Sequence, residues 1–243
     1  SLPTNVAAKL YAKNVPYRLA AITGYGVLYL LGPRTEEETA LDYSQLEGTT
    51  IYNVGKAATP EYIFSHILKQ NGIDPQEDLS VRFQYPHPEL AQLLIAERVE
   101  LGVLPEPFVT KVLMNNPDVT ILLDLQKEWA KLKGSGESYP MSCVVVKKEI
   151  AEQHPGIVEA FLAAYGDSIR WVKENPEKAG NLSEKHGIGM DAETAEAAIP
   201  RLNLRFKHAE KAKPEVEAFL QVLFAIDPAS IGGSLPDSSF YLE

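Results

Sequence analysis

The stretch TTIYNVGKAATPEYIFSHILKQNG (Thr49–Gly72) predicts a strand followed by a helix in the middle of the chain. Its first seven residues are mostly β-branched, aromatic or apolar, which predicts a strand. From Thr59 onward apolar side chains recur at spacings of three and four, with Pro60 at the start and Gly72 at the end. This pattern predicts a helix whose first turn is capped by Thr59 and which Gly72 terminates.

The alternation of strand and helix continues along the chain from this stretch. Further strands are predicted at 79–85, 100–104 and 119–125, with helices between them. Strands that alternate with helices predict a parallel sheet covered by helices. Residues 46–125 are therefore expected to form one α/β region, and the polar segment 126–140, with Gly-Ser-Gly at its centre, is expected to be a connecting loop.

Two segments about a hundred residues apart resemble each other. SLPTNVAAKLY (1–11) and VLPEPFVTKVL (103–113) share a Leu-Pro pair, a helix-like run and a polar corner that leads to an apolar strand. The distance is too long for a solenoid, whose repeats span roughly 20–50 residues. The match indicates two similar lobes, with chance similarity as the alternative.

The last third of the chain is predicted to be mainly helical. A strand is expected near Met141, and helices follow at three-to-four spacing as far as residue 226. Phe161, Trp171 and Phe219 fall on the apolar stripes of these helices and are expected in the core. Cys143, the single cysteine, lies in the strand and is expected to be a buried, inert thiol.

Composition excludes several classes of function. The chain has 243 residues, 45% of them hydrophobic, and a formal net charge of -10. This charge argues against a nucleic-acid partner. The longest apolar runs are far shorter than a membrane span, so the protein is expected to be soluble or the soluble part of a larger one. One cysteine excludes an internal disulfide. The five histidines form no HExxH pattern, and no nucleophile elbow is present, so neither a metal site nor a catalytic site is predicted.

The junction Gly55–Pro60 is a candidate ligand site. Small residues allow the backbone to approach a ligand, and the positive end of the following helix favours a carboxylate, phosphate or sulfonate. The spacing does not match a nucleotide-binding P-loop. An ordinary capped helix, with Lys56 simply solvated, would have a similar sequence, so both interpretations stay open.

A second candidate lies in PEPF (Pro105–Phe108), at the predicted carboxyl end of a strand, where ligands bind in open parallel sheets. Glu106 could accept hydrogen bonds from a ligand amine or hydroxyl, or could cap its own helix. Gly24 and Gly26, on either side of Tyr25, allow a sharp bend or a close approach of the backbone to a ligand.

The segments LPTNVAAKLY, GYGVLYLLG, GTTIYNVGKAATPEYIFSHILKQNGIDP, ELAQLLIAERVELGVLPEPFVTKVL, YPMSCVVVKKEIAEQHPGIVEAFL and SIGGSLPDSSFY together resemble the solute-binding proteins of bacterial ABC importers, in the nitrate/sulfonate/taurine group. The resemblance covers nearly the whole chain. It implies the type II periplasmic-binding-protein fold: an α/β protein of two lobes, each with a central sheet flanked by helices. It also implies a ligand cleft between the lobes, which a hinge closes.

The resemblance implies boundaries and binding residues. Lobe one is expected at 1–45 plus 137–243 and lobe two at 46–136. Members of the family usually carry some tens of residues before the LPTN position, so the N-terminal part of lobe one is expected to be missing from this sequence. The implied ligand-binding residues are Thr4, Asn5, Gly24, Tyr25, Gly26, Ala57, Ala58, Thr59, Glu106, Pro107, Phe108 and Tyr139, with Pro140 as a weaker candidate.

The implied function is capture of a small solute and its delivery to an ABC permease in the membrane. No enzymatic activity or cofactor is expected. The expected ligand is an anion or a heterocyclic metabolite, and the protein is expected to be a monomer, periplasmic or anchored outside the cell as a lipoprotein. The alternatives are a ligand-binding sensory domain and an enzyme like the thiamine-pyrimidine synthases, whose cysteine-rich iron-binding motif this chain lacks.

Overall fold

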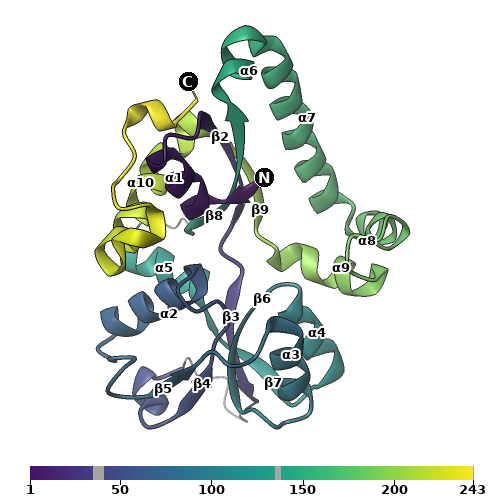
Figure 1. Ribbon diagram of the computed structural model, residues 1–243. Helices are drawn as coiled ribbons and strands as arrows, with labels where there is room; N and C mark the ends of the chain where they lie inside the picture. The colour runs from purple at the N-terminus through teal and green to yellow at the C-terminus, as the bar shows by residue number, and fades with distance from the viewer. Residues whose placement is uncertain (35–40, 135–137, 243) are drawn as a thin grey trace. The chain divides into compact units, whose positions relative to one another are not determined.

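The computed structural model describes residues 1–34, 41–134 and 138–242, which fall into two compact units (Figure 1). Unit 1 consists of Ser1–Gly26, Ser138–Ala179 and Leu202–Glu243, and unit 2 of Val27–Glu137 and Gly180–Arg201. The boundaries differ from the predicted ones in two places. Residues 27–34 join unit 2 because they form a strand in its sheet, and residues 180–201 join it because α9 packs on α4.

Unit 1 is built on a four-stranded antiparallel sheet. Its strand order is β1 (Leu2–Pro3), β8 (Pro140–Lys147), β2 (Tyr17–Tyr25) and β9 (Leu204–His208). Cys143 pairs with Leu2 on one side and Ile22 on the other and has no exposed surface. Burial raises the pKa of its thiol to about 12, so the predicted buried, inert thiol is confirmed.

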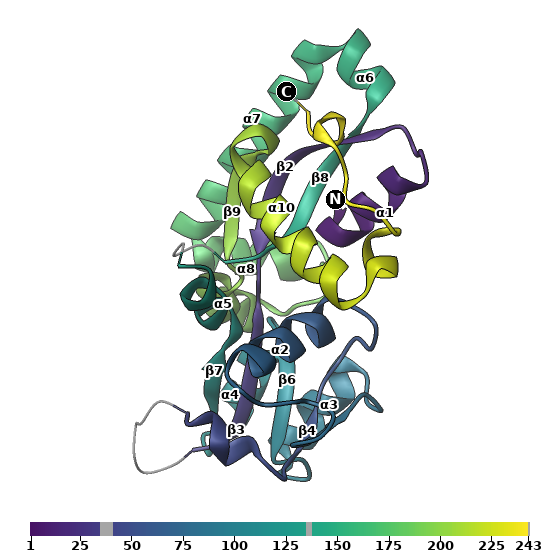
Figure 2. The same cartoon turned by 90° about the vertical axis from the view of Figure 1, so that its left-hand side faces the viewer.

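Helices cover this sheet. α10 (Ala209–Ile226) lies across the strands, as Figure 2 shows, while α7 (Pro155–Glu174) packs against β9 and β2. The remaining helical segments are α1 (Thr4–Ala12), α6 (Lys148–Gln153), η3 (Pro228–Ile231) and η4 (Ser238–Phe240). α8 (Pro176–Lys185) begins in unit 1 and ends in unit 2.

The predicted core positions in the helical region are only partly correct. Phe219 of α10 is buried, as predicted. Phe161 and Trp171 are 50% and 40% exposed, so their assignment to the core was wrong. α7 turns Val158, Leu162 and Ile169 to the interior. Phe161 lies one position before Leu162, and Trp171 two positions after Ile169, which turns both rings away from the buried stripe.

Unit 2 is built on a five-stranded mixed sheet. Its order is β5 (Ser80–Arg82), β4 (Thr50–Tyr52), β6 (Leu101–Pro105), β3 (Leu28–Pro33) and β7 (Val119–Asp124). β4 pairs in parallel with both β5 and β6, so the predicted parallel pairing is confirmed there. β3 enters between β6 and β7 and is antiparallel to both. The prediction of a purely parallel sheet was therefore wrong. The sheet is mixed because β3, from an earlier part of the chain, pairs antiparallel with two of its strands.

The helices of unit 2 follow its strands. They are α2 (Thr59–Gln70), α3 (His87–Ile95), α4 (Phe108–Asn115), α5 (Leu125–Lys133) and α9 (Ala192–Ala198), with the short turns η1 (Tyr43–Leu46) and η2 (Ile199–Arg201). α5 lies where a loop was predicted. The Asp124 carboxylate caps it by accepting hydrogen bonds from the Gln126 and Lys127 N–H groups, and Gly134 ends it in the left-handed conformation. The predicted Gly-Ser-Gly loop centre lies largely outside the described residues.

The core of unit 2 joins its central strands to α3 and α4. Leu31 of β3, Leu104 of β6, Leu94 of α3 and Val112 of α4 are buried together in this cluster. On the other side α2 packs on α5, where the His66 and Trp129 rings lie 5.5 Å apart. Within the described residues, no helix combines the length and the apolar character that a membrane crossing requires.

Candidate functional site

The corner between β6 and α4 in unit 2 holds a buried ionic network. The side chain of Glu106 has no exposed surface. Its Oε2 accepts a hydrogen bond from the Thr110 N–H at 3.0 Å, and its Oε1 accepts one from the Arg201 Nε at 2.5 Å. Arg201 also donates from Nη2 to the Thr110 hydroxyl at 2.7 Å. Glu106 therefore caps the first turn of α4 and holds Arg201.

The network joins segments that are far apart in the sequence. Arg201 ends η2, which follows α9, and its backbone carbonyl accepts a hydrogen bond from the Tyr29 hydroxyl of β3 at 3.3 Å. Burial, with the nearby Asp124 and Glu106 charges, raises the pKa of Tyr29 to about 12, so this hydroxyl remains a donor at neutral pH. Arg201 thus connects η2 to the Glu106 carboxylate through its side chain and to β3 through its carbonyl.

The predicted contact of Glu106 with a ligand stays a prediction, and the structure shows what its carboxylate binds within the chain. Both carboxylate oxygens already accept hydrogen bonds from Thr110 and Arg201. The alternative, a carboxylate that caps its own helix, describes the first of these contacts. Sequence reasoning missed Arg201 because no local motif links it to Glu106. The available signal was chemical, since a buried carboxylate requires a cation or several donors.

At the junction between β4 and α2, a side chain of the protein binds at the helix N-terminus that the sequence predicted as an anion site. α2 begins at Thr59, so Ala58 is the N-cap and Thr59 is not the capping residue that the sequence predicted. The Ala57 N–H donates to Oε2 of Glu61 at 2.5 Å. A carboxylate of the chain itself thus occupies the positive end of this helix. Lys56 is exposed.

Aromatic side chains gather at the same strand ends of unit 2. Tyr52 ends β4, and its ring lies 5.3 Å from that of Tyr85. Phe108 begins α4, and its ring lies 5.5 Å from that of His87. Burial lowers the pKa of His87. Tyr52, Tyr85 and Phe108 are only partly buried against the core of unit 2, so apolar ring surface remains beside the ionic network.

The candidate residues of unit 1 contact groups of the protein itself. A Cβ on Gly24 would lie 2.6 Å from the Ser142 hydroxyl, and one on Gly26 would lie 2.2 Å from the Tyr139 ring. The glycines therefore admit these side chains, which is a different reason from the predicted approach of a ligand. Within unit 1, the Gly26 N–H also donates to the Tyr139 carbonyl at 3.0 Å.

The aromatic candidates of unit 1 are buried. Tyr25 is 1% exposed, donates its hydroxyl to Glu215 at 2.7 Å and lies under the Arg205 guanidinium at 5.0 Å. Tyr139 is fully buried and stacks on Phe219.

The two candidates at the start of α1 differ in exposure. Thr4 is buried, whereas Asn5 is partly exposed. Among all the predicted binding residues, Gly26 and Tyr139 are in contact in unit 1. In unit 2, Glu106, Pro107 and Phe108 are consecutive in the chain and lie at the corner between β6 and α4.

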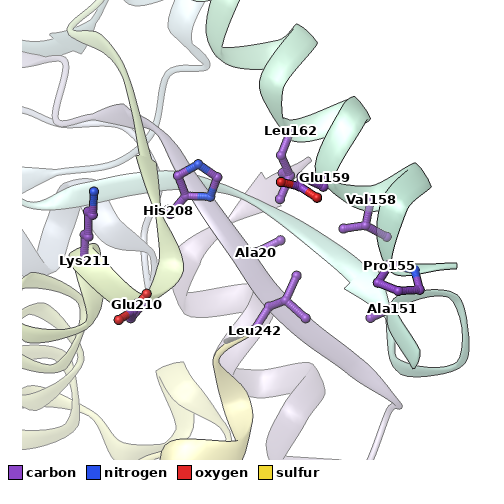
Figure 3. A pocket seen from close by; sticks show the side chains of 10 residues that line it. All are labelled: Ala20, Ala151, Pro155, Val158, Glu159, Leu162, His208, Glu210, Lys211 and Leu242. Carbon is purple, nitrogen blue, oxygen red and sulfur yellow. The ribbon is translucent and has the colours of Figure 1, made fainter. Parts of the chain in front are cut away.

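Unit 1 also has a surface groove of about 460 Å³, which Figure 3 shows. Ala20, Val158, Leu162 and Leu242 line its apolar part, and these residues belong to or pack on the core cluster of unit 1. His208, Glu159, Glu210 and Lys211 are the polar residues that line it. The predicted binding residues lie elsewhere, so the groove extends the core and adds nothing to the candidate site.

The described residues contain no group of three or more His, Cys, Asp or Glu side chains arranged to hold a metal ion. The ionic network of unit 2 is made of hydrogen bonds between Glu106, Thr110 and Arg201. Its chemistry is that of a guanidinium fixed on a buried carboxylate.

Comparison with known proteins gives one family and a set of similar structures. Residues 35–179 match the family described as NMT1/THI5 like. No curated protein matches the chain. A crystal structure described as an ABC transporter from Parabacteroides distasonis is 26% identical, with 100% of this chain and 79% of that chain aligned and a TM-score of 0.83.

Two further solved structures share the fold at lower identity. The periplasmic aliphatic sulphonate-binding protein SsuA from Escherichia coli is 13% identical, with 99% of this chain and 75% of that chain aligned and a TM-score of 0.70. The periplasmic nitrate-binding protein NrtA from Synechocystis PCC 6803 is 12% identical, with coverages of 98% and 67% and a TM-score of 0.64. The predicted fold class, with two sheets flanked by helices as in periplasmic binding proteins, is confirmed.

Proposed function

The chain belongs to the NMT1/THI5-like family, and from this membership we propose that it is the solute-binding component of an ABC importer. In this role it captures a small organic or anionic solute outside the cytoplasm and delivers it to a permease in the membrane. The observation that carries the proposal is the similarity along the whole chain to a solved ABC transporter protein. The binding-protein neighbours at lower identity support the fold on which it rests.

The proposed mechanism is capture without chemical change. Following the family resemblance, the solute contacts both units and stabilises a closed form, which the permease recognises. A ligand shifts such an equilibrium only by its difference in affinity for the two forms. Residues on both units must therefore contribute to binding, and no turnover of the solute is expected.

The proposed solute contacts follow the resemblance, with one change of role. Thr4, Asn5, Gly24, Tyr25, Gly26, Ala57, Ala58, Thr59, Pro107, Phe108 and Tyr139 remain the proposed contacts. Glu106 is proposed to act indirectly, because its side chain is completely buried and its oxygens accept from Thr110 and Arg201. Phe108 is the best placed of the aromatic contacts, since its ring is partly exposed at a strand end.

The finer parts of the proposal concern location and assembly. We place the protein in the periplasm or on the outer side of a membrane, held there as a lipoprotein, and expect it to act as a monomer. Its partners are a small solute and the permease.

Identification of the natural solute tests the proposal. The protein is purified from its native host, desalted and denatured, and the small molecules released are identified by mass spectrometry. The expected result is one solute in near-stoichiometric amount. When it is added back to solute-free protein, it should raise the melting temperature by several degrees and be recovered unchanged. A released molecule that the protein converts to a product would contradict the proposal.

A further inference from the structure

The Arg201 guanidinium group forms hydrogen bonds along one of its edges and leaves another edge available. A guanidinium has five N–H groups in a fixed planar arrangement. Its Nε donates to Glu106 and its Nη2 donates to the Thr110 hydroxyl, so the edge formed by these two nitrogens is in use. Nη1 and the second N–H of Nη2 have no hydrogen-bond partner within the part of the chain that the structure describes.

The free edge is rigidly placed and partly exposed. The Arg201 side chain is 33% exposed, while the Glu106 side chain that holds it is completely buried. The backbone of Arg201 is fixed as well, because its carbonyl accepts from Tyr29. A guanidinium fixed in this way loses little side-chain entropy when it forms further hydrogen bonds.

The geometry of the free edge fits an oxyanion. Its two parallel N–H groups match the two oxygens of a carboxylate, or two of the three oxygens of a sulfonate. The buried Glu106 charge balances the Arg201 charge, and Asp124 is paired with Lys127 at 3.4 Å. With no excess positive charge in the network, a monoanion is favoured over a dianion.

We propose that Arg201 binds the oxyanion group of the solute, and that the solute is an organic monoanion carrying a carboxylate or a sulfonate. This rests on the proposed function. Glu106 and Thr110 are the positioning residues that aim the guanidinium. The rings of Phe108 and His87, 5.5 Å apart at the start of α4 and α3, offer apolar surface for an aromatic or aliphatic body.

The test compares three probes of similar shape by isothermal titration calorimetry on the intact, solute-free protein. Benzoate and benzenesulfonate carry the two anionic groups, and benzamide is a neutral counterpart of benzoate. At least one anion should bind about 10- to 100-fold more tightly than benzamide, because charge-assisted hydrogen bonds differ from neutral ones by about that factor. The anion that binds more tightly distinguishes the carboxylate from the sulfonate.

Two matched substitutions locate the effect. Arg201→Lys keeps the positive charge but lacks the second parallel N–H group, so it should lose most of the preference for the anion. Arg98→Lys alters an exposed arginine of the same unit and should leave the preference for the anion unchanged. The preference of the wild-type protein for the anion is itself a test, so the inference remains falsifiable if Arg201→Lys folds poorly.

Two results would overturn the inference. One is that neither benzoate nor benzenesulfonate binds more tightly than benzamide, or that no probe binds at millimolar concentration. The other is an anion preference that persists in a folded Arg201→Lys variant. Neither would remove the proposed function, because a neutral solute released from the native protein would still support solute capture.

Discussion

The two Leu-Pro corners of the chain share a backbone plan and differ in chemistry. In unit 1, β1 ends at Pro3, and α1 follows and leads to β2. In unit 2, β6 ends at Pro105, and α4 follows and leads to β7. The predicted repeat of Leu-Pro turn, helix and strand is therefore present in both units.

What differs is the group at the start of the helix. In unit 1, Thr4 is buried, and its hydroxyl makes no strong hydrogen bond, with the Cys143 thiol as a weak partner. In unit 2 the aligned position is Glu106, whose carboxylate binds Thr110 and Arg201. The repeated local sequence thus gives strand, helix and strand twice, although α1 begins directly at Thr4 and α4 begins two residues after the aligned position, at Phe108. A single charged residue with a distant partner makes only one corner an ionic site.

The largest effect is expected for Arg201→Met, which leaves the buried Glu106 carboxylate without its cation. Removing one partner of a buried pair costs about 3 kcal/mol, at the low end because the Thr110 N–H remains. In a Trp171→Phe background, Trp129 fluorescence reports urea unfolding of unit 2 alone, since the chain has two tryptophans. A loss below about 1 kcal/mol would show that the network does little for unit 2.

A smaller loss is expected for Glu106→Gln. The amide oxygen keeps an acceptor for Thr110, and the partly exposed Arg201 can be solvated, so we expect about 1.5 kcal/mol by the same urea assay. The double variant should then lose less than the sum of the two single variants. Additive losses would mean that Glu106 and Arg201 are not coupled.

A still smaller effect concerns pH and unit 2. Burial lowers the pKa of His66 and of His87, with Lys133 adding to the effect on His66. Below pH 6.5 these histidines bind protons more readily in the unfolded chain than in the folded protein. The free energy of unfolding should therefore fall as the pH is lowered from neutral. The loss should be under about 1 kcal/mol, because both rings retain access to water.

Denaturant unfolding at pH 7.5 and pH 5 checks this expectation. The paired substitutions His66→Gln and His87→Gln should weaken the pH dependence of unit 2. His154→Gln, at an exposed position of unit 1, is the control and should not. The expectation is contradicted if the pH dependence of stability is the same in the His66 and His87 variants as in the His154 control.

The smallest effect is expected at the first corner. Thr4→Val keeps the shape of the side chain and removes a hydroxyl that has no strong partner. Stability measured by calorimetry should change by less than about 0.5 kcal/mol, since removing an unsatisfied polar group can offset the lost contact with Cys143. A loss comparable to that of Glu106→Gln would erase the difference between the corners.

Local pattern predicted the elements that depend on neighbouring residues. The strands and helices from Thr50 to Asp124 lie close to where periodicity placed them, because each buries its own apolar stripe. The insertion of β3 between β6 and β7 was missed, since strand pairing is set by residues far away in the chain. α5 was taken for a loop because its polar sequence hides one buried ring, Trp129, and an Asp124 cap.

The candidate site was predictable to a similar degree. Sequence reasoning singled out Glu106 as an acceptor of hydrogen bonds, and its contact with a ligand stays a prediction; its partner Arg201 was not foreseen. Arg201 is 95 positions further along the chain, and it ends a short 3-10 turn that carries no recognisable motif. The glycines beside Tyr25 were noticed for their small size, yet the groups that need this space, Ser142 and Tyr139, come from the distant strand β8 and from the residue just before it.

The role of Arg201 in solute binding can be measured by comparing the solute released from native wild-type protein with that released from the Arg201→Lys variant, both produced in the native host. We predict that wild-type protein releases an organic monoanion in near one-to-one amount, and that the folded variant retains about a tenth of it or less. The same solute at the same occupancy in both proteins would contradict the account.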